Sequence, residues 1–295
     1  MIQLVLKPSL TDDQLRPMMG KYIDHRSYDI LVNSRTHPEP FQLVDGLTKE
    51  PKAVWVPNAL SVDFAQAAFH SLRGAATVTT NRGTAAGGGF LRKRPDGTYS
   101  RTNVSKPVMS AIIGYYDRYA RKNYCRSCAW NAQHPKEWEK ALPLFKQISH
   151  LFSIYCPEKY ALQKKVAENV HPDFLIKDTV FSTVTVNKNY QTSVHKDGLN
   201  LRDSFSCFNV LKHGVYDGGF LIFPRYRVAF DCGNTDVMFF MPQEPHGTSE
   251  IKNLIEGKSY ERLSLVYYIR EKMTLCGSMA EEMERGKRVH GGLDQ

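Results

Sequence analysis

The chain has 295 residues, of which 42% are hydrophobic and 23% charged, a composition typical of a globular protein with a buried core. Its apolar runs are far shorter than the ~20 residues that span a bilayer, and its start carries neither a basic leader nor a cleavage site. We therefore expect an intracellular, soluble protein with no membrane partner, and its net charge of +9 favours a polyanionic partner.

The first quarter of the chain contains one clear helix signal. Residues 1–60 are mixed, with turn residues and a short apolar run, and predict no single dominant element. In residues 62–75 the apolar side chains of Phe64, Ala68 and Leu72 recur at helical spacing, which predicts an amphipathic helix.

The loops after this helix combine glycine with positive charge. Asn81 and Arg82 begin the stretch NRGTAAGGG, where they could form a backbone anion nest, contact substrate or cosubstrate, or only turn the chain. The basic loop that follows supplies the predicted contacts to a nucleic-acid backbone: Arg92, Lys93, Arg94 and Arg101. A second basic stretch, 115–126, interleaves tyrosines with arginines and lysines, which suits phosphate contact and base stacking. A solvated basic surface is the alternative interpretation of these loops.

Residues 107–175 are predicted to be largely helical. Six apolar side chains recur every three or four residues despite Pro143, and we assign them to the core: Trp138, Leu142, Phe145, Ile148, Leu151 and Phe152. The region also contains one CxxC pair, Cys125 and Cys128, but a structural zinc site normally needs a second pair. With six cysteines spread along the chain, we expect reduced cysteines that pack in the interior and no disulfide framework.

From residue 178 the pattern changes to short strands rich in β-branched and aromatic residues. Seven such segments are bounded by Gly, Pro, Asn or Asp: 179–187, 191–195, 206–211, 218–224, 226–231, 236–242 and 261–270. Short strands without intervening helices are typical of an antiparallel sandwich or jelly roll. We predict an α+β fold with a double-stranded β-helix (jelly-roll) core and N-terminal helices packed on its outside.

His195 and Asp197 stand two residues apart at the end of a predicted strand, so their side chains share one face. That face is either a solvated polar surface or two ligands of one metal ion. His246 follows the apolar segment 236–242 in a proline-flanked turn and is the best third ligand. Two histidines and one carboxylate form the facial triad of non-haem Fe(II) oxygenases. Arg262 opens the last apolar strand, where a buried guanidinium needs an anion such as a 2-oxoglutarate carboxylate.

Beyond these ligands, several stretches make the chain resemble the TET/JBP family of Fe(II)- and 2-oxoglutarate-dependent dioxygenases, which oxidise the 5-methyl group of pyrimidines in DNA. The stretches are NRGTAAGG, GYYDR, CRSCAW, LPLFKQIS, FSTVTVNKNYQTSVHKD and GGFLIFPRYRVAFDCGNTDVMFFMPQEPHGTS. They look most like the thymine-hydroxylase (JBP) branch, and the resemblance extends from about residue 67 to residue 273. We recognise in this sequence neither a TET-like cysteine-rich domain nor an added JBP-type domain for glucosylated DNA, and therefore expect a minimal catalytic unit.

The resemblance implies roles for the site residues. His195, Asp197 and His246 would hold Fe(II) and form the catalytic centre. Arg262 would bind the distal carboxylate of 2-oxoglutarate, with Ser264 on the same strand face as a helper.

The resemblance also implies contacts to the target base from Asn200, Tyr268 and Arg270. Each has an alternative: Asn200 could only turn the loop after the metal pair, Tyr268 could belong to the core, and Arg270 could form a surface ion pair. Arg270 departs from the histidine that TET enzymes place there, so recognition of the base edge is expected to differ.

We predict that the chain hydroxylates 5-methylcytosine in DNA by base flipping, with dioxygen as cosubstrate and no obligate protein partner. The alternatives are thymine as the target, a protein or small-molecule substrate, and a non-catalytic nucleic-acid-binding protein. Residues 1–295 would form one catalytic domain, divided into a helical and loop support and DNA-contact region (1–177), a jelly-roll core (178–275) and a C-terminal tail (276–295). Such an enzyme would suit a phage, and would then lie in the cytoplasm of a bacterial host.

Overall fold

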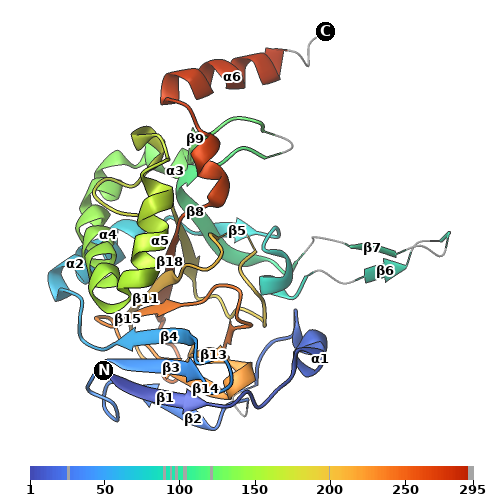
Figure 1. Ribbon diagram of the computed structural model, residues 1–295, viewed down its shortest axis with the longest axis vertical. Helices are drawn as coiled ribbons and strands as arrows, with labels where there is room; N and C mark the ends of the chain where they lie inside the picture. Colours follow the sequence, from blue (N-terminus) through green and yellow to red (C-terminus); the bar gives the residue numbers. More distant parts are fainter. Residues whose placement is uncertain are drawn as a thin grey trace.

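Two packed β-sheets form the centre of the fold, and helices cover the outer face of the larger sheet (Figure 1). The computed structural model describes residues 1–24, 27–88, 91–93, 95–96, 99–101, 105–119, 122–198 and 200–291. The side chains of residues 91–93, 99–101 and 290–291 are not among those described.

The larger sheet draws strands from both ends of the chain. Its strand order is β1-β3-β4-β15-β11-β18-β10-β8-β5, and β9 pairs with β8. The bounds are β1 (Ile2–Leu6), β3 (Phe41–Asp45), β4 (Pro51–Val56), β5 (Thr77–Thr79), β8 (Val108–Tyr116), β9 (Arg126–Ser127), β10 (Thr183–Lys188), β11 (Ser206–His213), β15 (Val237–Phe240) and β18 (Glu261–Tyr268). All neighbours pair antiparallel except β1 and β3, so N-terminal strands extend a sheet whose centre comes from the C-terminal half.

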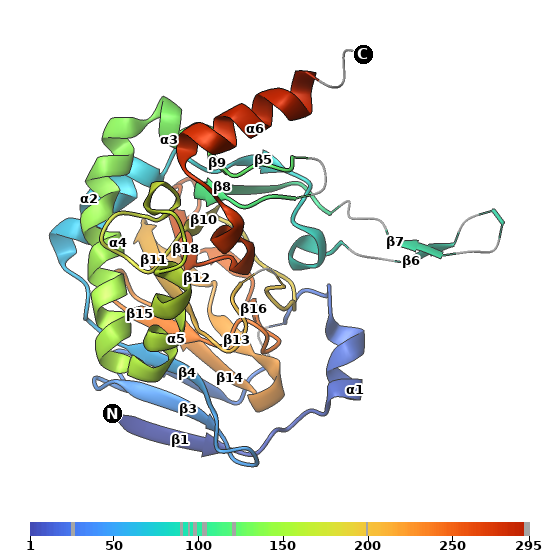
Figure 2. The ribbon, with the colours of Figure 1, turned by 45° about the horizontal axis from the view of Figure 1, so that its top comes forward.

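The smaller sheet closes the jelly roll over the inner face of the larger one. Its order is β16-β13-β14-β2, with bounds β2 (Ile30–Asn33), β13 (Leu221–Phe223), β14 (Val228–Asp231) and β16 (Gly247–Thr248). Two further pairs stand apart, β12 (Tyr216–Gly218) with β17 (Ile251–Asn253) and β6 (Leu91–Lys93) with β7 (Tyr99–Arg101). The β6–β7 pair projects as an arm from the body (Figures 1 and 2).

Two apolar cores hold these layers together. Between the sheets lie side chains that include Trp55, Phe208, Phe223, Phe230 and Phe240. On the outer face of the larger sheet, helices cover a second core that contains Phe145, Phe152, Phe239, Leu265 and Tyr267. Each central strand therefore buries both of its faces, which is why its sequence is almost continuously apolar.

The helices come mainly from the N-terminal half, as predicted. They are α1 (Asp12–Leu15), α2 (Val62–Leu72), α3 (Ala129–Gln133), α4 (Pro135–Tyr155), α5 (Pro157–Ala167) and α6 (Met279–Gly291). Helix α4 continues through Pro143. It buries Phe145, Ile148 and Phe152 of the predicted stripe, and the other three residues of the stripe are partly buried against the same core. In α2 the buried face is Ala65, Ala68, Phe69 and Leu72, whereas Phe64 is 40% exposed.

Two element predictions are wrong. The predicted helical zone from residue 107 begins instead with strand β8, in which Ile113 is buried and Gly114 has φ +91. A Cβ at Gly114 would lie 2.6 Å from the Ser182 carbonyl oxygen, so this close strand contact requires glycine. The predicted strand 191–195 is an extended segment without a ladder, because Ser193 and Val194 donate their backbone N–H groups to the loop carbonyls of Ala85 and Lys21.

One cysteine prediction is also wrong. Cys125 and Cys276 form a disulfide across a sequence separation of 151 residues. Both cysteines were expected to be reduced, but the fold places the distant Cys276 beside Cys125. The other four cysteines are free and buried, as expected. Within the part of the chain that the structure describes, no helix is long and apolar enough to cross a membrane.

Candidate metal centre and substrate cavity

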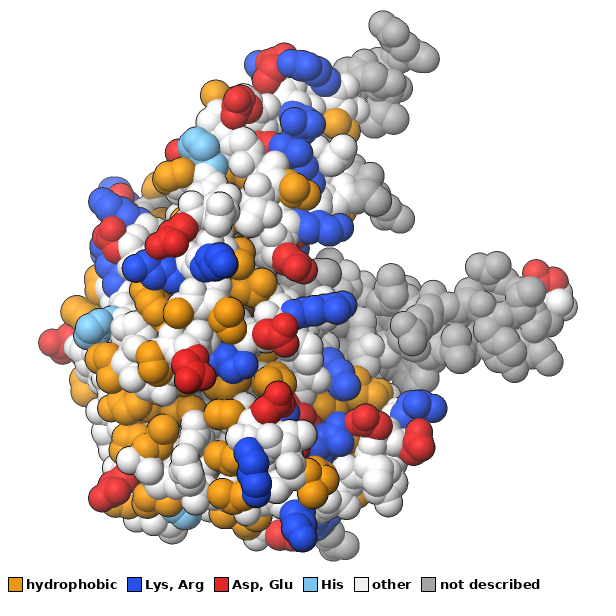
Figure 3. Space-filling view, viewed as in Figure 1, with side chains coloured by type: hydrophobic (Ala, Val, Ile, Leu, Met, Phe, Trp, Pro, Cys, Tyr) orange, Lys and Arg blue, Asp and Glu red, His pale blue; other side chains and the backbone are white. Residues whose placement is uncertain are grey.

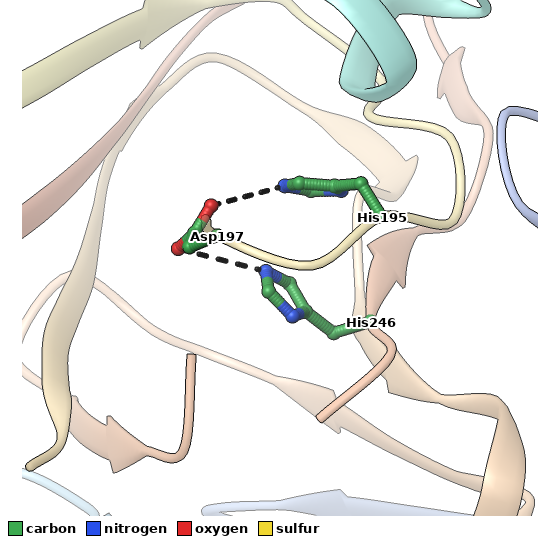
Figure 4. Close-up of side chains that lie close together, drawn as sticks. All are labelled: His195, Asp197 and His246. Atoms are coloured by element: carbon green, nitrogen blue, oxygen red, sulfur yellow. Dashed lines mark ion pairs between the residues drawn. The ribbon is translucent and has the colours of Figure 1, made fainter. Parts of the chain in front are cut away.

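His195, Asp197 and His246 converge on one point between the sheets (Figure 4). One ligand atom from each residue lies within 4.8 Å of the others. Asp197 Oδ1 is 3.5 Å from His195 Nε2, and Asp197 Oδ2 is 4.0 Å from His246 Nε2. Two imidazoles and one carboxylate at this spacing are a donor set for a divalent transition metal such as Fe(II).

The backbone holds both imidazoles in one orientation. His195 and His246 exchange two backbone hydrogen bonds, of 2.8 and 3.0 Å. Each Nδ1 lies 2.8 Å from a carbonyl oxygen, that of Ser193 for His195 and that of Glu244 for His246. If Nδ1–H donates to that carbonyl, the lone pair of Nε2 is free, and both Nε2 atoms face Asp197. The triad therefore fits a metal ion through Nε2, Nε2 and a carboxylate oxygen.

Burial and mutual charge set the protonation of the triad. Burial alone would raise the pKa of Asp197, but the hydrogen bond and charge of the histidines lower it below its ordinary value. Burial and the neighbouring His195 lower the pKa of His246 to about 4. Burial opposes the charged form of His195 too, yet its contact with Asp197 raises its pKa. An ionised carboxylate and a neutral His246 are the forms that metal ligation needs.

Arg262 is a buried cation without a carboxylate partner. It is 2% exposed, its Nη2 donates to the Gly219 carbonyl at 2.6 Å, and its Nη1 is buried without a hydrogen-bond partner. No ion pair to Arg262 occurs among the described residues. Gly219 has φ +70, and a Cβ there would lie 2.7 Å from Arg262 Nε, so glycine makes room for the guanidinium. This orphaned donor fits one carboxylate of 2-oxoglutarate.

Alternate residues of β18 connect this arginine to the triad cavity. Ser264, Val266 and Tyr268 follow Arg262 on the same strand face, and all three line a cavity of about 300 Å³ that also contains the triad. The intervening residues Leu263, Leu265 and Tyr267 point into the helix-side core. The predicted cosubstrate residues therefore lie at one end of a strand whose other end reaches the predicted base contacts.

The predicted base contacts lie together at that other end. A backbone bridge joins Asn200 to Arg270, and both line the cavity with Tyr268. The Asn200 amide nitrogen donates to Ser206 Oγ at 2.7 Å and to Asp197 Oδ2 at 3.4 Å. Arg270 is not a surface residue: it is 8% exposed and pairs with buried Asp117 at 2.8 Å.

Arg82 lines the same cavity and, like Arg262, forms no ion pair with the residues that the structure describes. Its Nε is buried without a partner, and burial lowers the pKa of its guanidinium. Asn81 lines the same cavity and is exposed, with its Oδ1 2.6 Å from Thr79 Oγ1. Among the backbone contacts predicted beside them, Arg94 lies outside the described residues, as do the side chains of Arg92, Lys93 and Arg101.

Some cavity residues were missed by the sequence reasoning. Thr185 and Asn187 line the cavity from β10, and Asp117 holds Arg270. The stretch TVTVN alternates polar with apolar residues, and this alternation could have shown one polar strand face. Nothing local marks Asp117, because its partner is 153 residues away.

A family profile decides what kind of centre this is. The Tet_JBP profile, described as the oxygenase domain of the 2OGFeDO superfamily, matches residues 111–271, more than half of the chain and all three candidate ligands. The chain belongs to this family. The predicted enzyme class of the Tet_JBP oxygenase domain, dependent on Fe(II) and 2-oxoglutarate, is confirmed, and so is the double-stranded β-helix fold.

Relatives of this Tet_JBP domain are much longer proteins. The bifunctional helicase and thymine dioxygenase JBP2 of Trypanosoma brucei brucei is 29% identical over 281 residues, 93% of this chain but 23% of that protein. The thymine dioxygenase JBP1 of the same organism is 29% identical over 182 residues, 61% of this chain and 21% of the relative. The chain thus spans about a quarter of the length of these relatives. The structure of NgTET1 in complex with 5mC DNA matches the fold with a TM-score of 0.57 at 13% identity, over 84% of each chain.

Proposed function

We propose that this oxygenase domain hydroxylates the 5-methyl group of a pyrimidine in DNA. The names of the sequence relatives, thymine dioxygenases aligned along most of this chain, favour thymine as the base. The initial preference for 5-methylcytosine has weaker support, because the likeness to the TET complex rests on 13% identity and concerns the fold alone. The test therefore includes both bases, and thymine is the preferred candidate.

The observation that carries the proposal is one cavity with three kinds of group. It contains a candidate metal triad and lies along β18, near whose start Arg262 has no ion pair among the described residues. Its wall includes the aromatic Tyr268 and the cationic Arg270. Fe(II) with 2-oxoglutarate and dioxygen supplies the oxidising chemistry when bound. In the proposal His195, Asp197 and His246 hold the metal, and Arg262 with Ser264 holds the distal carboxylate.

The size of the cavity bears on how substrate enters. A cavity of about 300 Å³ takes a single nucleobase and excludes a duplex. A methyl group stacked inside a duplex cannot approach the triad, so the nucleotide must be flipped out or already single-stranded. Tyr268 would then stack on the extracted base, an interaction worth roughly 1–3 kcal/mol.

The polar groups at this end suit the edge of a pyrimidine. The Asn200 amide nitrogen is already engaged, which leaves its carbonyl oxygen as an acceptor for the base. Arg270 Nε is buried without a partner and offers a donor. Because thymine and 5-methylcytosine each present both donors and acceptors, these two contacts are compatible with either base.

The test incubates the purified chain with Fe(II), 2-oxoglutarate and DNA. One DNA has thymine as its only 5-methylpyrimidine, and a second DNA also contains 5-methylcytosine. Digestion to nucleosides and mass spectrometry should detect a 5-hydroxymethyl product from one or both DNAs, in step with succinate. The variants His195→Ala and Asp197→Ala should abolish both products.

Asp203→Asn is the matched control, because Asp203 lies in the same loop but is exposed and belongs to none of the proposed contacts. It should keep full turnover. Wild-type succinate production in Asp197→Ala would refute the metal assignment, and absence of any oxidised nucleoside from both DNAs would refute the substrate assignment.

A further inference from the structure

A ladder of alternating tyrosines and arginines leads from the cavity to the surface. The Arg270 guanidinium carbon lies 6.0 Å from the Tyr268 ring centroid and 5.5 Å from that of Tyr116. Arg126 stacks on Tyr116 at 4.4 Å and reaches the Tyr119 ring at 5.0 Å. The ladder therefore joins the proposed base-stacking tyrosine to Tyr119, which is 42% exposed.

The outer arginine of this ladder lacks a negative partner. Arg270 is neutralised by Asp117, and Arg118 in the same stretch is neutralised by Glu282. Arg126 forms no ion pair with any carboxylate of the described chain, and its Nη1 is buried without a hydrogen-bond partner. Its Nη2 lies 3.3 Å from the Tyr119 hydroxyl oxygen. A cation held among tyrosine rings is positioned for an anion from outside the chain.

The segment that carries the ladder is anchored from both ends. Glu282 of α6 is fully buried, pairs with Arg118 and accepts the backbone N–H of Cys125 at 2.7 Å. The disulfide from Cys125 to Cys276 adds a covalent tie. Such anchoring lowers the entropy that the aromatic groups would lose when they bind a partner.

The ladder segment also lies on a suitable side of the molecule. The described residues of the connection between β8 and β9 lie on the same side of the body as the β6–β7 arm (Figures 1 and 2). On the face shown in Figure 3, Lys and Arg side chains occur along α6 and near the base of the arm, with acidic side chains between them. A strand of nucleic acid that enters the cavity from this side would pass the ladder.

We propose that Tyr119 and Arg126 form a subsite for the nucleotide next to the one in the cavity. The neighbouring base would stack on the exposed Tyr119 ring, and its phosphate would pair with Arg126. The subsite rests on the proposed function, because it needs a DNA strand whose adjacent nucleotide occupies the cavity. It extends the recognition of DNA beyond the target base.

The test places the fluorescent base 2-aminopurine on either side of the target pyrimidine in a single-stranded oligonucleotide. On binding, stacking should quench the probe at one of the two positions, and Tyr119→Ala should remove that quenching. In anisotropy titrations Tyr119→Ala and Arg126→Gln should each weaken DNA binding about 5- to 10-fold. Arg126→Gln should also reduce the slope of the logarithm of the DNA-binding constant against the logarithm of the salt concentration by about one, the share of one phosphate contact. Arg126→Lys should keep the parent's slope.

Arg35→Gln is the control, because Arg35 is an exposed arginine next to β2 of the smaller sheet. It should bind like the parent, and all variants should keep the parent's melting temperature. Absence of quenching at both probe positions, or parental affinity in both Tyr119→Ala and Arg126→Gln, would overturn the subsite. A parent that binds and quenches but oxidises no base would instead contradict the proposed function alone.

Discussion

Arg262 and Arg270 lie near the two ends of one strand, and their partners decide what each can do. Arg270 is held by the Asp117 carboxylate, so its charge is compensated within the chain. Arg262 has a carbonyl and no carboxylate among the described groups, and one of its buried nitrogens is unsatisfied. An unsatisfied buried charge is costly to folding, which supports the proposal that Arg262 binds an anionic cosubstrate.

Replacing Arg262 by lysine should weaken binding of 2-oxoglutarate. Lysine keeps the charge but loses the planar pair of donors, and we expect the dissociation constant to rise about 10- to 100-fold. Titration of the anaerobic Fe(II) protein with 2-oxoglutarate, followed by its charge-transfer absorbance, measures this directly. Metal binding itself should be unchanged, and an unaltered titration would exclude Arg262 as the carboxylate ligand.

Removing the partner of Arg270 should destabilise the fold. The variant Asp117→Asn leaves a buried guanidinium without its carboxylate, which we expect to lower the free energy of unfolding by about 3–5 kcal/mol. Chemical denaturation measures the loss. Asp178→Asn is the matched control, because Asp178 pairs with Lys146 at the exposed surface, where an ion pair adds little. Equal stability of the two variants would mean that Asp117 does not hold Arg270.

At the scale of elements, the connection from β8 to β9 depends on the C-terminal part of the chain. Cys276, before α6, and Glu282, within α6, both bind the backbone or side chain of this connection. Helix α6 itself projects from the body (Figure 1). The helix thus serves as an anchor for a segment that lies beside the cavity.

The double variant Cys125→Ser/Cys276→Ser should therefore be less stable than the parent. In the chain-entropy account, closing a loop of this length stabilises a protein by about 3–5 kcal/mol. Thermal unfolding should show a lower midpoint for the double variant, and a reductant should lower the midpoint of the parent only. Six titratable thiols in the parent denatured without reductant, where an intact disulfide leaves four, would contradict the disulfide.

At the scale of the whole molecule, the triad joins two segments 49 residues apart that the jelly roll brings together. A metal ion bound there links the loop after β10 to the segment between β15 and β16 and stabilises the folded state only. Fe(II) or Co(II) at 100 times its dissociation constant should add about 2.7 kcal/mol, which raises the melting temperature by several degrees. Chelator should reverse the shift, Asp197→Ala should abolish it, and Asp203→Asn should retain it. A metal-induced shift that persists in Asp197→Ala would place the ion elsewhere.

The layered architecture was predictable because its signals are local. The apolar strands of the C-terminal half and the stripe of α4 each show their period within a few residues. The spacing of His195 and Asp197 was likewise visible, although the segment is not part of a strand ladder. Its backbone hydrogen bonds go to residues distant in the sequence, such as Lys21, Ala85 and His246, which no local pattern reveals.

The sequence by itself predicted the donor set of the candidate metal centre, an apolar strand with Arg262 near its start, and a succession of short strands in the C-terminal half, since each depends on residue type and short spacing. Only the tertiary structure decided which cations are paired, which cysteines are joined and which tyrosines form the ladder. These features depend on contacts such as Asp117 with Arg270 or Cys125 with Cys276, more than 150 residues apart. Chain folding brings such partners together through the packing of the sheets and helices between them, and no local periodicity encodes that arrangement.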